Sequence, residues 1–423
     1  MTSPAQLAPA WITSAAEWLT PSRILAQAIV LALCLWGVCA VDFATPGLFD
    51  RAGNIKFQDF LQFYISACLI REGRTSQLFN QHLADEKMRA LIGEHAPVHL
   101  PPVYGPQVGL LFIPLARLSF PAAARIWVTL SLLAVGACLY LIWRSCLGLR
   151  PHARTVAICA VAYPPLFHFF VRGQISALVL VCFSAAFLAF RADRNWLAGI
   201  ALGFLVFKPQ FLVALPLVLL LSQAWKAFAG LAAAAGGQLA LSGIYFGPTV
   251  MHTYFDTMLH MSRWIGLSEI GPAPIQMHSL RSFWTLLMPS PEIALALYVL
   301  SSIVIVAMAA LVWKSSAALA VRFSALTLAA VLVNPHLFVY DLLALAPVLL
   351  LLVNWTLTNA HPASTPTLRL LLYLAFVLPL FGPLSRWTHV QLSVPAFAAL
   401  LWVLWRNSGA SSHKLASNES SVV

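Results

Sequence analysis

Long apolar runs recur along the whole sequence, and they constrain its fold more than any other feature. A helix that crosses a bilayer needs about 20 mostly apolar residues, and residues 24–44 and 122–143 are clear runs of that length. Hydrophobic residues form 60% of the 423-residue chain and charged residues 9%, whereas a soluble domain is roughly one quarter charged. The sequence predicts an all-α polytopic integral membrane protein with roughly 11–13 transmembrane or re-entrant helices, several of them shorter than a full span.

The basic residues predict how these helices are oriented. The net charge of +11 comes mostly from residues in short connections between apolar runs, as the positive-inside rule describes, and does not indicate a nucleic-acid partner. Arg23 precedes the first run, so we expect the N-terminus inside and the loop 45–102 outside. That loop is amphipathic, which favours juxtamembrane helices. We expect a multi-pass protein of the inner (plasma) membrane.

The segment 103–118 is apolar but short, and prolines interrupt it at Pro106 and Pro114. If it crossed the membrane, the arginines that follow the run 122–143 would face outside, against the charge rule. These are Arg144, Arg150 and Arg154. We therefore interpret 103–118 as re-entrant or juxtamembrane.

Four parts are expected along the chain. Residues 1–22 are predicted to be a cytoplasmic lead-in with an interfacial helix around 11–19, and residues 23–353 the main membrane module. Residues 354–406 are predicted to form the C-terminal transmembrane helices. The Ser-rich residues 407–423 are predicted to be a disordered cytoplasmic tail.

No pattern indicates a cofactor or a metal. The seven cysteines lie mainly inside apolar segments, form no CxxC pair or histidine cluster, and are interpreted as small core residues. Nucleotide-binding and HExxH patterns do not occur. The sequence predicts neither a cofactor nor a bound metal.

Asp59 is the most unusual acid in the sequence. Only 14 carboxylates are present, half of them between residues 42 and 94, and Asp59 stands among Phe57, Phe60 and Phe63. A carboxylate partly removed from water has a raised pKa and is a better base. The alternative is structural, because Asp59 could be the N-cap of a helix over 60–71.

Three later apolar segments are each broken near the middle by a polar tip. The tips are Arg172-Gly173-Gln174, Lys208-Pro209-Gln210 and Asn334-Pro335-His336. Basic residues at the far ends place the tips on the outer side with Asp59. Ionisable groups at membrane depth are costly and usually line a site. We expect a shared anion site, although Gly and Pro could simply form turns while the cations snorkel.

This arrangement suits a sugar carried on a lipid phosphate: cations would bind the phosphate and Asp59 would accept a proton from the attacking hydroxyl. A transporter or flippase of an anionic or lipid-linked substrate is the alternative, since transporters also build sites from broken helices. A membrane subunit without chemistry is a third possibility, and it leaves the three cationic tips unexplained.

The order of several short motifs resembles glycosyltransferase family 87 over residues 24–350. The motifs are Asp59-Phe60, Tyr64-Ile65-Ser66-Ala67, Gly73, Leu78-Phe79, Tyr104, Pro106, Pro114-Leu115, Ala124, Trp127, Gly173-Gln174, Lys208-Pro209-Gln210, Pro335-His336 and Tyr340-Asp341. Each motif is weak, and the order makes the match specific. Phe79 departs from the family, whose members more often have tyrosine there, and the C-terminal third carries no motif, which leaves the acceptor open.

The resemblance implies a GT-C-type bundle over 23–353 that transfers a hexosyl group, mannosyl above others, from a polyprenyl-phosphate sugar to a lipid or glycan. It implies that Asp59 is the catalytic base on the periplasmic side and that His336 lies near the donor phosphate. Asp341 would orient His336 or cap a broken helix. Substrate contacts are expected from Arg172, Gln174, Lys208, Gln210, Tyr64 and Tyr104. One positioned carboxylate fits a single displacement that inverts the sugar.

Overall fold

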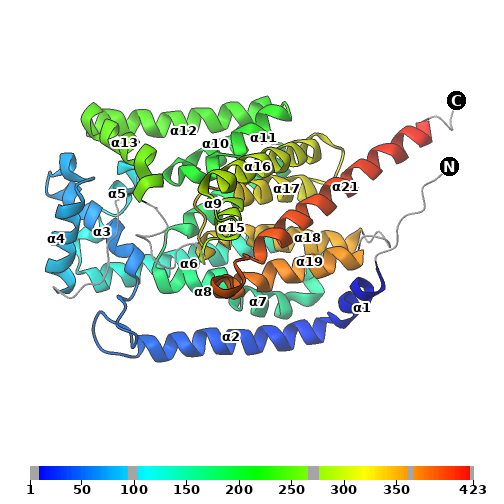
Figure 1. Ribbon diagram of the computed structural model, residues 1–423, viewed down its shortest axis with the longest axis horizontal. Coiled ribbons are helices and arrows are strands. Elements are labelled where there is room, and N and C mark those ends of the chain that lie inside the picture. The colour runs from blue at the N-terminus through cyan, green and yellow to red at the C-terminus, as the bar shows by residue number, and fades with distance from the viewer. Residues whose placement is uncertain (1–8, 94–102, 265–275, 360–364, 420–423) are drawn as a thin grey trace.

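The computed structural model describes residues 9–93, 103–264, 276–359 and 365–419 as an all-helical protein (Figure 1). Long helices run side by side along the horizontal axis of the view, with α2 at the lower edge and α12 at the upper edge. Short helices α3, α4 and α5 form the left end. Helix α1 and the C-terminal end of α21 lie at the right end.

The helices are, in chain order, α1 (Ala10–Trp18), α2 (Pro21–Phe43), α3 (Gln58–Arg71), α4 (Gln81–Ile92), α5 (Pro106–Leu111), α6 (Phe120–Arg144), α7 (Ala153–Val161), α8 (Pro164–Arg172), α9 (Ser176–Arg191), α10 (Asn195–Gly203), α11 (Leu215–Leu221), α12 (Trp225–Phe246), α13 (Pro248–Trp264), α15 (Leu280–Leu287), α16 (Pro291–Lys314), α17 (Leu319–Leu332), α18 (Ala346–Thr358), α19 (Thr365–Val377), α20 (Ser385–Thr388) and α21 (Ser393–Glu419). Seven 3₁₀ helices accompany them in the described part: η1 (Thr75–Gln77), η2 (Leu115–Arg117), η3 (Leu147–His152), η4 (Phe204–Phe207), η5 (Pro209–Leu212), η6 (Val339–Leu345) and η7 (Leu378–Leu384).

The apolar helices confirm the predicted fold class. Within the described residues, 6 helices are long and apolar enough to cross a membrane, and the bent pair 147–161 and 164–172 makes a seventh candidate. Four shorter apolar helices complete the set: Ser176–Arg191, Asn195–Phe207, Pro209–Leu221 and Leu319–Leu332. The protein is an all-α polytopic membrane protein.

The first loop is helical, as its amphipathic pattern predicts. Helices α3 and α4 pack on each other, and α3 also packs on the segment 103–118, which forms α5 and η2. Neither α5, with 6 residues, nor η2, with 3, is long enough to cross a bilayer. This segment therefore contains no helix of bilayer length and serves as a platform for α3.

Glycines allow α10 to lie directly against α12. A Cβ atom at Gly199 would lie 2.0 Å from the carbonyl oxygen of Ala227, and one at Gly230 would lie 2.3 Å from that of Trp196. Small residues spaced this way let membrane helices approach closely, because lipid offers no hydrophobic drive for helix association. This contact sets the position of the break that follows α10, at Lys208.

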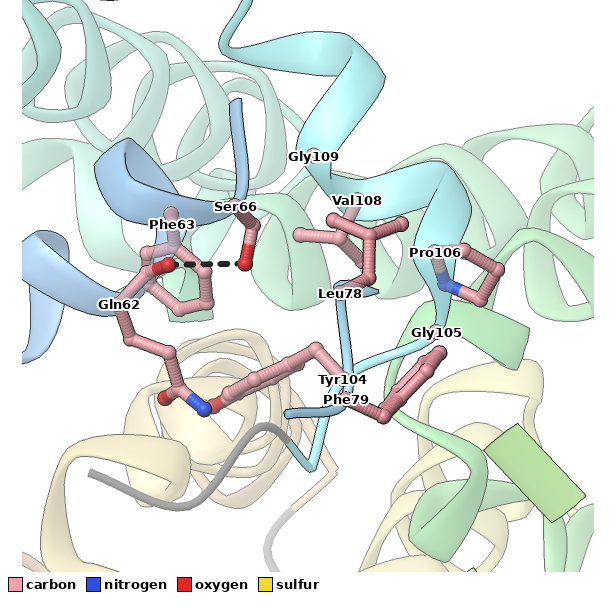
Figure 2. A pocket seen from close by; sticks show the side chains of 10 residues that line it. All are labelled: Gln62, Phe63, Ser66, Leu78, Phe79, Tyr104, Gly105, Pro106, Val108 and Gly109. Atoms are coloured by element: carbon pink, nitrogen blue, oxygen red, sulfur yellow. Dashed lines mark hydrogen bonds between the residues drawn. The ribbon is translucent and has the colours of Figure 1, made fainter. Parts of the chain in front are cut away.

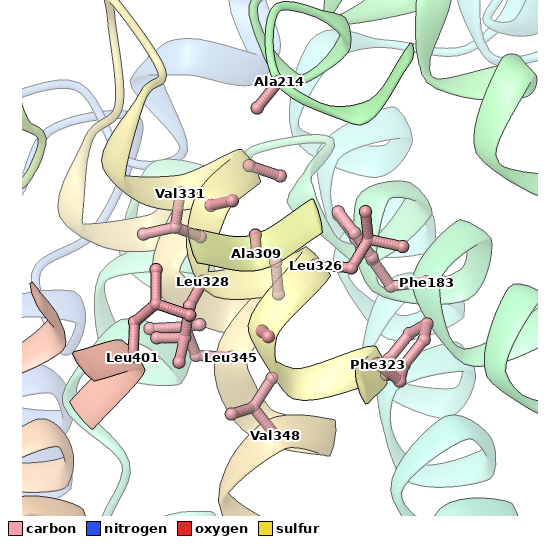
Figure 3. Packing of buried hydrophobic residues seen from close by; sticks show 14 of the residues in the cluster. Phe183, Ala214, Ala309, Phe323, Leu326, Leu328, Val331, Leu345, Val348 and Leu401 are labelled. Carbon is pink, nitrogen blue, oxygen red and sulfur yellow. The ribbon is translucent and has the colours of Figure 1, made fainter. Parts of the chain in front are cut away.

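Helix α17 is the centre of the bundle. It is apolar on every side, the pattern of a helix surrounded by protein, and buried residues occur along its whole length. Figure 3 shows Phe323, Leu326 and Val331 of α17 packed among Phe183 of α9 and Leu401 of α21. The polar break at its end is thus enclosed by other helices, where unpaired backbone groups are tolerated.

The C-terminal helix differs from its prediction. Helix α21 continues to Glu419, beyond Asn407, where a disordered tail was expected. Residues 407–419 contain one glycine and no proline, so a helix already anchored by its packed half can propagate through them. Residues 1–8 and 420–423 of the two predicted terminal parts lie outside the described residues.

Candidate functional site

Asp59 lies in the first turn of α3, next to the end of α8. The N-cap of α3 is Phe57, in the left-handed region with φ 57°, and its side chain makes no capping hydrogen bond. The helix therefore begins two residues earlier than the capping alternative required, and Asp59 is not its N-cap. A non-glycine residue in this conformation is strained, which is typical of functional sites. Phe57 is held there by edge contacts with the rings of Phe43 and Phe170.

Gln174 joins Asp59 to Tyr104. Its Nε2 donates to Oδ2 of Asp59 at 2.8 Å, and its Oε1 accepts from the Tyr104 hydroxyl at 3.3 Å and from the backbone N–H of Ile175 at 3.1 Å. Gln174 is buried, so both ends of its amide are used. This series of hydrogen bonds from Tyr104 through Gln174 fixes the orientation of the Asp59 carboxylate. Its second oxygen, Oδ1, is left facing Arg172.

The Arg172 tip approaches Asp59 because Gly173 ends α8. Gly173 has φ +67°, and a Cβ atom there would lie 3.0 Å from that of Phe57. Its carbonyl accepts from Trp127 Nε1 at 3.1 Å. The Arg172 guanidinium lies 3.9 Å from Asp59 Oδ1, and its side chain is 34% exposed.

These surroundings set the proton affinity of Asp59. Its side chain is 14% exposed. Burial raises the pKa of the Asp59 carboxyl above its usual range, and the Arg172 charge and the Gln174 hydrogen bond offset part of that rise. A carboxylate with a raised pKa and a fixed orientation has the properties of a general base.

The second tip carries a buried ion pair. Lys208 Nζ lies 2.5 Å from Asp341 Oδ1, and both side chains are at most 2% exposed. Ser176 Oγ donates to the same oxygen at 2.6 Å and accepts from Lys208 at 3.3 Å. The ion pair joins Lys208, just before η5, to Asp341 in η6. Ser176, the first residue of α9, adds a third segment to this contact. Asp341 therefore has a role that neither sequence alternative named, and sequence reasoning missed Ser176, which carries no local signal beyond following a tip.

The lysine also lies against two aromatic rings. Its Nζ is 5.2 Å from the ring centroid of Tyr340 and 5.9 Å from that of Tyr104. Tyr104 thus contacts both Gln174, which is hydrogen-bonded to Asp59, and Lys208, which is paired with Asp341. The first two tips therefore belong to one site.

The third tip supplies neutral polar groups. Burial lowers the pKa of His336 to about 4, so its ring is uncharged at neutral pH. The His336 backbone N–H donates to Asn334 Oδ1 at 2.9 Å. Within the described residues, His336 Nδ1 and Asn334 Nδ2 are buried without hydrogen-bond partners. His336, which the sequence marked as a potential cation, is thus a neutral polar group in this structure.

Two predicted substrate contacts lie apart from this group. The Tyr64 hydroxyl donates to the carbonyl of Leu118 at 2.6 Å, which fastens α3 to the 103–118 platform. Gln210 is half-buried on η5, and in the described part of the chain no hydrogen bond joins it to Asp59 or Lys208.

A small cleft opens beside Tyr104, one turn of α3 beyond Asp59 (Figure 2). Its free space is about 330 Å³ when its open, solvent-facing side is included. Its walls are formed by Gln62, Phe63, Ser66, Leu78, Phe79, Tyr104, Gly105, Pro106, Val108 and Gly109. The close-up shows Phe79 and Tyr104 next to each other at its lower edge. Phe79, the position that departs from the family pattern, thus faces a space beside the site.

Comparison with known proteins identifies the family. Residues 103–337 match the model of glycosyltransferase family 87, a range that includes the three tips and Tyr104 but not Asp59 or Asp341. No curated protein and no solved structure matches the chain. Since the matched range is more than half of the 423 residues, and the chain is an all-α membrane protein with these tips gathered beside a buried carboxylate, it belongs to glycosyltransferase family 87.

Proposed function

We propose that this membrane glycosyltransferase transfers a hexosyl group, mannosyl above others, from a polyprenyl-phosphate donor to a lipid or glycan acceptor with inversion. The observation that carries the proposal is the position of Asp59, a part-buried carboxylate oriented by Gln174 at 2.8 Å and facing the cationic tip Arg172 at 3.9 Å. A base next to a cation is what displacement of a phosphate leaving group requires.

In the proposed step, the acceptor hydroxyl oxygen forms a bond to the anomeric carbon while Asp59 accepts the hydroxyl proton. The bond from the anomeric carbon to the phosphate oxygen breaks, and its electron pair leaves with the polyprenyl phosphate. Arg172 and Lys208 would stabilise the charge that develops on that phosphate, and His336 would donate a hydrogen bond to it. One displacement at one carbon inverts its configuration.

A large apolar cavity supports a lipid-linked donor. It lies between α2, α7, α18 and α19, has about 2260 Å³ of free space including its open side, and is lined by aliphatic and aromatic side chains over most of its surface. Leu343 and Ala346 line it and follow Asp341 in the chain by two and five residues. A polyprenyl chain in this cavity would have its phosphate next to the site.

The cleft beside Tyr104 is the proposed acceptor entrance. It lies on α3, the helix that carries Asp59, and the Tyr104 hydroxyl reaches Asp59 through Gln174. An acceptor in this cleft would present its hydroxyl to Asp59 from the side of α3 and Tyr104.

The site is proposed to face the periplasmic side of the inner membrane. Basic residues end the helices at the end opposite the tips, with Arg144 closing α6, Arg191 closing α9 and Lys314 closing α16. Such residues favour the cytoplasmic side, which leaves α3 and the tips outside.

The test is transfer from labelled polyprenyl-phosphate sugars by the purified protein in lipid, with extracted envelope lipid and glycan as acceptors. Transfer from the mannosyl donor is expected, and Asp59→Asn should reduce the rate by about 10²–10⁴-fold, the usual value of general-base catalysis. Asp42→Asn is the matched control, because Asp42 is a half-exposed acid in the last turn of α2. An Asp59→Asn enzyme as fast as wild type, or a loss only in Asp42→Asn, contradicts the assignment.

A further inference from the structure

The segment before α15 lies against the third tip. The backbone N–H of His278 donates to the carbonyl of Leu337 at 2.9 Å, and Met277 and Phe338 form an isolated antiparallel bridge. His278 Nδ1 is also 2.7 Å from Ser393 Oγ of α21. The segment is therefore fixed to the break that follows α17.

Arg281 follows three residues later, in the first turn of α15. The backbone N–H of the N-cap residue Ser279 donates to Ser282 Oγ at 3.1 Å, which defines where that helix begins. The Arg281 charge is near enough to lower the pKa of His336 together with burial. Arg281 is half-buried, and in the part of the chain that the structure describes its guanidinium has no carboxylate partner.

Two buried polar atoms at this tip have no hydrogen-bond partner among the described residues. Asn334 is fully buried, its Oδ1 accepts from the His336 N–H, and within the described residues its Nδ2 has no partner. His336 Nδ1 is likewise without a partner there. Buried polar atoms of this kind are costly unless a hydrogen-bond partner is supplied, and a bound ligand would supply one.

The balance of charges in the site also indicates Arg281 as a ligand-binding cation. Lys208 is matched by Asp341 and Arg172 faces Asp59, so these four charges cancel. A phosphate that enters needs a further positive charge, because an uncompensated anion in a buried site is unfavourable. Arg281 is the cation beside this tip that the described residues leave unmatched.

We propose that Arg281, with Asn334 Nδ2 and His336 Nδ1, forms the subsite that binds the phosphate group of a lipid monophosphate. The inference rests on the proposed function for the identity of that lipid, a polyprenyl phosphate. Arginine suits this role because its planar guanidinium can bind two phosphate oxygens at once.

The experiment measures binding of a polyprenyl monophosphate, and of the uncharged polyprenol, to the full-length protein in lipid nanodiscs. Arg281→Gln should weaken monophosphate binding by about 10- to 100-fold, which corresponds to loss of one charge-assisted hydrogen bond. Polyprenol binding should not change. Arg386→Gln on α20 is the control, since Arg386 is an exposed arginine outside the site. Monophosphate binding by Arg281→Gln equal to that of wild type would overturn the inference.

A second variant keeps the inference testable if Arg281→Gln fails to fold. Asn334→Asp keeps the Oδ1 acceptor for the His336 N–H and replaces the NH2 donor with a carboxylate oxygen. It should weaken monophosphate binding through loss of the donor and through charge repulsion, and leave polyprenol binding unchanged. Equal monophosphate affinity in Asn334→Asp would remove Asn334 from the subsite.

If wild type binds the monophosphate through Arg281 but transfers no sugar from any polyprenyl-phosphate donor, the proposed function fails and the subsite stands. If wild type transfers sugar and Arg281→Gln has the same KM for the donor, the subsite fails alone.

Discussion

Two acid–cation pairs in this site have similar chemistry and different surroundings. Asp341 and Lys208 lie 2.5 Å apart with side chains at most 2% exposed, whereas Asp59 and Arg172 lie 3.9 Å apart with side chains 14% and 34% exposed. Ser176 completes the first pair and Gln174 orients the acid of the second. The tight pair has its charges satisfied by protein, and the loose pair leaves an oxygen and a guanidinium within reach of a ligand.

The difference shows how one protein separates structure from chemistry. A buried ion pair is stable only with good geometry and further hydrogen bonds, and removing one partner leaves an uncompensated charge. Such a pair holds helices in place and has little freedom to exchange a proton. A carboxylate that is desolvated but loosely paired has a raised pKa and can accept a proton. We therefore expect the tight pair to determine stability and the loose pair to determine rate.

The largest expected effect follows from breaking the tight pair. Lys208→Met should lower the free energy of unfolding by about 3–5 kcal/mol, because Asp341 would be left buried and unpaired. The double variant Lys208→Met with Asp341→Leu should recover most of that loss. Thermal unfolding in lipid nanodiscs measures both losses. Arg172→Met, which removes a partly exposed and loosely paired partner, should cost about 1 kcal/mol or less. Equal losses for Lys208→Met and Arg172→Met would contradict the comparison.

The same double variant also tests whether Lys208 acts on the donor. If the Lys208 charge stabilises the departing phosphate, the double variant should transfer sugar more slowly than wild type even though its stability is restored. A rate equal to that of wild type would limit Lys208 to the structural role.

A smaller effect is expected in the pH dependence of transfer. Asp59 must be deprotonated to act, so kcat/KM should fall as the pH drops through its pKa. Burial raises that pKa, and the fall should lie above the range usual for aspartate. Arg172 lowers the pKa, so Arg172→Met should move the fall to still higher pH, and Arg386→Met should leave it in place. A fall that moves to lower pH in Arg172→Met would contradict the assignment of Asp59 as base.

The smallest effect is expected at Tyr104. Tyr104→Phe removes the 3.3 Å hydrogen bond to Gln174 Oε1 and keeps the ring over Lys208 and the edge contact with Phe63. Because Gln174 Oε1 still accepts from the N–H of Ile175, the cost should be about 0.5–1.5 kcal/mol in transition-state stabilisation, measured as kcat/KM. A loss as large as that of Asp59→Asn would mean that the Tyr104 hydroxyl itself contacts the reacting groups.

The membrane fold and the positions of the breaks were predictable because they depend on local properties. Apolar runs of bilayer length predict helices wherever they occur, and Gly173, Pro209 and Pro335 interrupt helices through their own backbone geometry. Asp59 stood out because acids are few and aromatic residues surround it in sequence. The N-cap of α3 was missed, since a left-handed Phe57 depends on contacts with Phe43 and Phe170 from distant helices.

The sequence by itself determined that this protein is a bundle of membrane helices with three cationic or polar tips and an unusual acid, Asp59, after the first apolar run. Only the tertiary structure decided which cation meets which acid. Lys208 and Asp341 are 133 residues apart and Asp59 and Gln174 are 115 apart, and no local pattern records such a pairing. It depends on how closely α10 packs on α12 and α8 on α3, because ion pairs and hydrogen bonds form only over a few ångströms.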